Sequence, residues 1–98
     1  MIVLTVYGRL NPGLRAIVIA LSERHRANSR KEPGCLAFDF FHSPDDPNHF
    51  VFVEEWESKA ALDAHSAAPS FAEFMAAVTP CLASPLDVRV FDAARLDG

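Results

Sequence analysis

Three residues in the middle of the chain have side chains suited to proton transfer or to hydrogen bonding with a ligand: Glu54, Trp56 and His65. His65 follows Leu62 by three residues and Ala61 by four, so in a helix it shares their apolar face and points away from solvent. A buried imidazole can act as a base or as a hydrogen-bond donor near neutral pH. The same spacing also fits a core histidine that donates to a backbone carbonyl, and both interpretations stay open.

Glu54 interrupts the apolar face of a predicted strand, which by period two also presents Phe52 and Trp56. A buried carboxylate must be paired or protonated. Pairing with an arginine such as Arg9 or Arg89 is one explanation, and ligand binding is the other. The indole N–H of Trp56 needs a partner when buried, and either a ligand oxygen or simple core packing accounts for this residue.

His25 follows the apolar stripe of the first predicted helix and either borders the same cavity or lies partly exposed near the polar end of that helix. Tyr7 lies on the opposite face of its strand, where a contact with a second chain is the expected role. The chain has eight phenylalanines, which suit a flat apolar ligand better than a charged one. Its four scattered histidines match no metal motif, so we expect no metal site.

The elements that must position these residues can be read from apolar periodicity and from turn residues. Ser58 is a predicted helix N-cap, and Pro69 is expected to break the second helical region in two. The two central strands form a predicted antiparallel hairpin. We expect strands at residues 2–10, 35–41, 50–56 and 86–91, a helix from residue 14 to the turn at 33–34, and helical segments between 58 and 80. The whole chain, 1–98, is predicted to be one α+β domain with a flexible tail at 92–98.

Two helices cover only one face of a four-stranded sheet, yet both faces of the predicted strands are largely apolar. Along the first strand, Ile2, Leu4 and Val6 alternate with Val3 and Tyr7. An uncovered apolar face is larger than monomers usually expose, and packing two sheets together hides it. The sequence therefore predicts a homodimer.

Bulk properties exclude several classes of partner. The net charge is −4, and the basic residues form no stripe that would neutralise nucleic-acid phosphates or an anionic membrane surface. The longest aliphatic run, residues 16–21, is too short to span a bilayer, and no basic leader region is seen. We therefore expect a cytoplasmic protein without nucleic-acid or membrane partners.

Several motifs together resemble one family. They are Glu-Pro-Gly-Cys-Leu at 32–36, Val-Glu-Glu-Trp-Glu-Ser at 53–58, Ala-Leu-Asp-Ala-His at 61–65 and Ser-Phe-Ala-Glu-Phe at 70–74. In this order they resemble the antibiotic biosynthesis monooxygenase domain, specifically its quinol-monooxygenase-like members. The resemblance implies a ferredoxin-like βαββαβ fold with a four-stranded antiparallel sheet, paired into a dimeric α+β barrel.

The resemblance also implies chemistry without a cofactor: a phenolic or quinol-like aromatic substrate is deprotonated, and its anion reduces dioxygen directly. His65 would then be base or donor and Trp56 a donor or wall, with Glu54 and His25 among the substrate-binding residues. The apolar lining would come from Phe38, Phe71 and Phe74. Met75 stands where haem-degrading relatives place an iron-binding histidine, which argues against haem degradation.

Two other functions stay open from the sequence. One is an isomerase that moves a proton on a small carbonyl metabolite through an enolate, again with His65 as proton shuttle. The other is a non-catalytic dimer that binds a small ligand.

Overall fold

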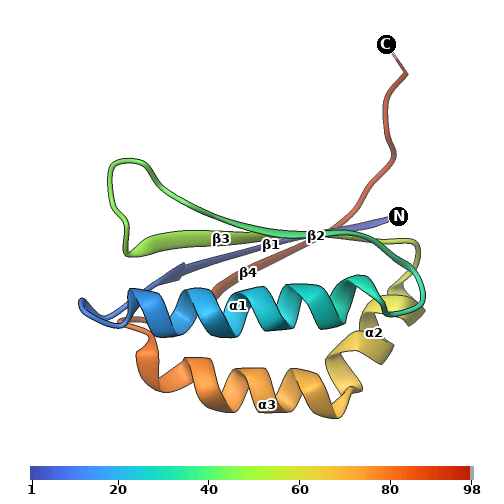
Figure 1. Ribbon diagram of the computed structural model, residues 1–98. Coiled ribbons are helices and arrows are strands. Elements are labelled where there is room, and N and C mark those ends of the chain that lie inside the picture. Colours follow the sequence, from blue (N-terminus) through green and yellow to red (C-terminus); the bar gives the residue numbers. More distant parts are fainter. Residues whose placement is uncertain (98) are drawn as a thin grey trace.

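A computed structural model describes residues 1–97, which form a sheet covered on one face by helices (Figure 1). The four strands of this region are antiparallel and lie in the order β2-β3-β1-β4. The strands are β1 (Ile2–Arg9), β2 (Cys35–His42), β3 (His49–Trp56) and β4 (Asp87–Asp92). The helices are α1 (Arg15–Arg30), α2 (Lys59–Ala67) and α3 (Pro69–Val78), followed by a short 3-10 turn at Thr79–Cys81. The predicted ferredoxin-like α+β fold is confirmed.

Strand β3 shows the expected alternation most clearly. Phe50, Phe52, Glu54 and Trp56 are buried, and the residues between them are only partly buried. This period-two pattern places the four buried side chains on the face that the helices cover. Glu54 pairs in register with Leu4 of the neighbouring strand, so the carboxylate lies in the centre of the sheet.

Helix α1 buries only part of the apolar stripe that its sequence predicts, which is Leu14, Ile17, Val18 and Leu21. Val18, Ser22, His25 and Ser29 face the sheet, and Leu14 and Leu21 pack partly buried against the core, whereas Ile17 is 52% exposed. Residues 18, 22, 25 and 29 are three or four positions apart, so they share one face of the helix. The helix is rotated about its axis so that this face, including its polar second half, meets the sheet. This rotation makes His25 a buried residue.

The second helical region is broken where the sequence predicted. Ser58 caps α2 by accepting a hydrogen bond from the backbone N–H of Ala61 at 3.1 Å. Ala68 then adopts an extended conformation, because the ring of Pro69 disfavours helical geometry in the preceding residue. The chain changes direction here, so α3 lies beside α1 while α2 closes one end of the layer (Figure 1).

The opposite face of the sheet carries no helix in residues 1–97 (Figure 1). On this side Phe41 and Phe91 are about half exposed, at 55% and 50%. Strand β4 extends to Asp92, the first residue of the predicted tail, and 93–97 has no regular secondary structure. Gly98, the last residue of that tail, lies outside the described residues. Within 1–97 no helix has the length and apolarity needed to cross a membrane.

Candidate active site

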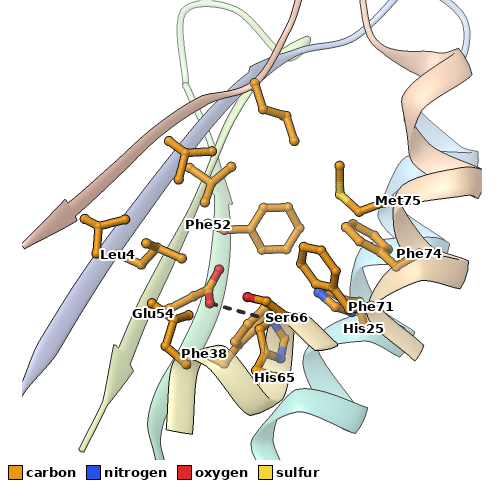
Figure 2. A pocket seen from close by; sticks show the side chains of 15 residues that line it. Leu4, His25, Phe38, Phe52, Glu54, His65, Ser66, Phe71, Phe74 and Met75 are labelled. Atoms are coloured by element: carbon orange, nitrogen blue, oxygen red, sulfur yellow. Dashed lines mark ion pairs between the residues drawn. The ribbon is translucent and has the colours of Figure 1, made fainter. Parts of the chain in front are cut away.

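A cavity of about 210 Å³ lies between the helix-covered face of the sheet and helices α2 and α3 (Figure 2). Its polar groups, Glu54, His65 and Ser66, gather at one end, and the rest of the lining is mostly apolar or aromatic. Val88 and Val90 line the cavity from edge strand β4 and are still more than half exposed, so the cavity opens at that edge. An apolar cavity of about 150 Å³ holds a benzene ring, so this one has room for a substituted monocyclic aromatic molecule.

His65 projects from α2 and is only 3% exposed. Its Nδ1 atom lies 2.6 Å from Oε1 of Glu32, a contact that assigns the ring proton to Nδ1 as donor to the carboxylate. In the neutral form of the imidazole the lone pair is then on the other nitrogen, Nε2, which lies 4.0 Å from Oε1 of Glu54. The ring is therefore held by a carboxylate, and not by the backbone carbonyl that the sequence left open, with its basic nitrogen on the side of Glu54.

Glu54 accepts a hydrogen bond of 3.0 Å from the indole Nε1–H of Trp56. Burial raises the pKa of Glu54 to about 7, and the charge of Glu32 adds to this increase while the Trp56 bond opposes it. Near neutral pH the carboxyl group therefore exists in both protonation states. It can give or take a proton at the polar end of the cavity.

The predicted pairing of Glu54 with Arg9 or Arg89 is wrong. Arg9 pairs with Asp46 at 2.9 Å, and Arg89 pairs with Asp87 at 2.8 Å. Both arginines are at odd positions of their strands, so they point to the face of the sheet opposite Glu54.

Trp56 is fully buried and stays behind the cavity wall. Its ring packs against His65 at a centroid distance of 4.6 Å while its N–H bonds Glu54. Trp56 therefore orients both groups, and it reaches the cavity only through them.

His25 belongs to the aromatic wall, together with Phe38, Phe71 and Phe74. The His25 and Phe74 rings are stacked in parallel, 3.9 Å apart. Burial, with a further contribution from His65, lowers the pKa of His25 to about 4. This ring is neutral at physiological pH, and its predicted partial exposure is not observed, since it is only 6% exposed.

The structure thus brings the predicted site residues together. His25, Phe38, Glu54, His65, Phe71 and Phe74 line one cavity, and Trp56 lies directly behind it. Sequence reasoning missed the role of Glu32, which lies 33 residues from its partner His65. It also missed Ser66 and Met75 as lining residues of the cavity. It missed the valines of β4 as well, because no local spacing connects β4 to the helices.

In residues 1–97, no group of three or more histidine, cysteine, aspartate or glutamate side chains is arranged to hold a metal ion. The chemistry open to the side chains themselves is proton transfer. Nε2 of His65 can accept a proton from a hydroxyl group of a ligand, and Glu54 can donate a proton back to that ligand. The aromatic wall beside them favours a flat apolar molecule.

Comparison with known proteins supplies the family. The family model described as antibiotic biosynthesis monooxygenase matches residues 1–77. Among curated proteins, the Uncharacterized protein sll1783 of Synechocystis is 35% identical over 88% of this chain, and the chain spans 58% of that relative's length. The Putative monooxygenase YcnE of Bacillus subtilis is 33% identical over 90% of this chain and 93% of its own.

Solved structures agree with this relationship. A crystal structure described as that of an antibiotic biosynthesis monooxygenase superposes with a TM-score of 0.90 at 34% identity, covering 97% of this chain and all of that one. Rv0793 of Mycobacterium tuberculosis superposes with a TM-score of 0.88 at 29% identity, covering 99% of this chain and 96% of its own. This chain therefore belongs to the antibiotic biosynthesis monooxygenase family.

Proposed function

We propose that this protein is a cofactor-independent monooxygenase that oxidises a small phenolic or quinol-like aromatic compound with dioxygen. The observation that carries the proposal is the placement of His65, held by Glu32 with Nε2 free, at the polar end of an apolar cavity. Family membership and the monooxygenase names of relatives support the same class of reaction.

The reaction begins with proton transfer. Nε2 of His65 takes the proton of a ring hydroxyl, and the resulting phenolate donates electrons to dioxygen. A new bond forms between a ring carbon and oxygen, the O–O bond breaks, and a ring C–H becomes C=O. One phenol and one dioxygen thus give one quinone and one water, and the substrate supplies all the electrons.

Two features of the cavity stabilise a bound phenolate, compared with the same anion in water. The protonated form of Glu54, oriented by the indole N–H of Trp56 behind it, offers a hydrogen bond to a developing oxyanion. The aromatic wall of His25, Phe38, Phe71 and Phe74 holds the ring and keeps away water that would protonate or hydrolyse a reactive intermediate.

An isomerase is a second candidate, because Glu54 and His65 face each other as a possible acid and base. Such a pair can remove a proton beside a carbonyl group and return it to a neighbouring carbon. This reaction needs no dioxygen, which separates it experimentally from the first.

The test follows oxygen consumption by the purified protein over a panel of hydroquinones and phenols, together with the His65→Ala variant. His49→Ala is the matched control, because His49 lies at the start of β3 and does not line the cavity. We expect uptake that is lost in His65→Ala and kept in His49→Ala. Uptake no higher than the uncatalysed background, or equal in both variants, would refute the monooxygenase. Anaerobic turnover of a carbonyl compound would identify the isomerase, and thermal stabilisation by the ligand without turnover would identify a binding protein.

We also propose that two chains pair through the helix-free sheet face and that the dimer works in the cytoplasm. The half-exposed Phe41 and Phe91 and the β-branched residues Val3, Val51 and Val53 support this pairing, since burying apolar surface drives association. Light scattering at micromolar concentration should return twice the mass of the chain. A monomer mass would contradict the pairing.

We propose that the whole chain, residues 1–98, is one domain, because β4 completes the sheet beyond the 1–77 segment that the family model matches.

A further inference from the structure

His65 separates two hollows of the protein. On one side it lines the cavity, and on the other it lines a second hollow of about 340 Å³ between α2 and the turn at residues 32–33. Glu32 and Glu57 line this outer hollow, and neither lines the cavity. The His65 side chain is 3% exposed, whereas that of Glu32 is 23% exposed and reaches solvent.

The polar groups form a line from the cavity to the surface. Oε1 of Glu54 lies 4.0 Å from Nε2 of His65, and Nδ1 on the far side of the same ring lies 2.6 Å from Oε1 of Glu32. An imidazole with a partner on each nitrogen can take up a proton on one and release a different proton from the other.

We propose that Glu32 is the outer end of a proton relay, through which a proton leaving a ligand hydroxyl in the cavity passes by way of His65 to solvent. The inference rests on the proposed function for the identity of the ligand, a phenol or quinol. The proposed monooxygenase reaction requires only a base, and the relay specifies the route by which the proton leaves the cavity.

The transfers balance. The hydroxyl O–H bond breaks as Nε2–H forms, Nδ1–H breaks as Glu32 becomes protonated, and Glu32 releases that proton to water or buffer in the outer hollow. When the O–O bond breaks and water leaves, Nε2 returns its proton and Nδ1 regains one from solvent through Glu32. Over a full cycle the histidine and the carboxylate are unchanged.

Other charged or titratable groups near this line are placed for different tasks. Glu54 lies on the cavity side, and His25 is buried and stacked on Phe74. Arg30 pairs with Asp39 at 2.6 Å and donates to a backbone carbonyl. Burial, with further contributions from the charges of Glu54 and Glu32, raises the pKa of the Cys35 thiol, which keeps it protonated. Among the described residues that line the outer hollow, Glu32 is the one whose side chain forms a hydrogen bond with the His65 ring.

The test uses 4-nitrophenol, whose phenolate is coloured, bound to an excess of the protein at about pH 6. A stopped-flow jump to about pH 8 in dilute buffer measures how fast the bound phenol ionises. Displacement by a competing phenol gives the dissociation rate separately. In the wild type we expect ionisation to be faster than dissociation.

The decisive variant is Glu32→Gln, because glutamine still accepts a hydrogen bond from Nδ1 but cannot take the proton. We expect ionisation to slow by roughly tenfold or more, to no faster than dissociation, and to recover when imidazole is added. Glu57→Gln is the matched control: it removes the same charge from the same hollow without a contact to His65, and should behave like the wild type.

Three results would overturn the relay. They are wild-type ionisation no faster than dissociation, an unchanged rate in Glu32→Gln, and an equal loss in Glu57→Gln. Retained ionisation in Glu32→Gln with loss only in Glu32→Ala would assign Glu32 to positioning the ring. Oxygen plays no part in the measurement, so a protein that relays protons but consumes no oxygen would contradict the proposed function and leave the relay standing.

Discussion

Replacing Glu54 with glutamine should stabilise the protein above pH 7 and leave its stability unchanged below about pH 4.5. Glu54 is 4% exposed, and burial raises its pKa from 4.5 to about 7. The folded state therefore holds this proton more tightly than the unfolded state does, so stability falls as pH rises through that window. At 1.36 kcal/mol per pH unit, the ionised carboxylate costs about 3 kcal/mol above pH 7.

His25 acts in the opposite direction over nearly the same window. Its pKa falls from 6.5 to about 4 on folding, so the unfolded state binds a proton first and stability is lost as pH drops from 6.5 to 4. The size is again about 3 kcal/mol. In the wild type the two slopes offset each other, and removing Glu54 should expose that of His25.

Urea unfolding of both proteins from about pH 4 to pH 8.5, at one fixed protein concentration, measures the difference. We expect the free energy of unfolding of Glu54→Gln, minus that of the wild type, to rise with pH from near zero to about 3 kcal/mol. Glutamine can still accept the Trp56 hydrogen bond, so packing is preserved. Glu55→Gln, on the opposite face of β3, is the control and should show no such rise. A difference that is constant with pH, or a variant less stable at pH 8, would refute the burial argument.

Two further substitutions test the supports of the site. Gly8→Ala should lower the free energy of unfolding by about 1–3 kcal/mol, because the added Cβ would overlap the ring of Phe50 and the side chain of Leu86. A neutral effect in urea unfolding would show that these two side chains move aside freely. Ser58→Ala should cost about 1 kcal/mol by removing the cap on the N–H of Ala61, and an unchanged melting temperature would show that the cap contributes nothing.

Local patterns were sufficient for the elements. The alternation in β3, the break at Pro69 and the cap at Ser58 each depend on interactions between residues a few positions apart, and all three were predicted. The rotation of α1 was not, because the side of a helix that meets the sheet also depends on α3, which packs beside it. Ile17 consequently points outward.

The candidate site shows the same division. The types of residue needed for proton chemistry, an inward histidine and a carboxylate on an apolar strand face, could be recognised from spacing in the helix and the strand. Their partners could not be. An arginine was considered for Glu54, but strand pairing turns Arg9 and Arg89 to the other face.

The sequence by itself determined the order of the elements, the alternation of the two faces along each strand and the presence of a histidine and a glutamate among apolar neighbours, since these follow from periods of 3.6 and 2. Only the tertiary structure decided that Glu32 holds His65 and that His25 is buried and neutral. The physical reason is distance along the chain: a hydrogen bond over 33 residues and a pKa set by burial depend on how the layers pack.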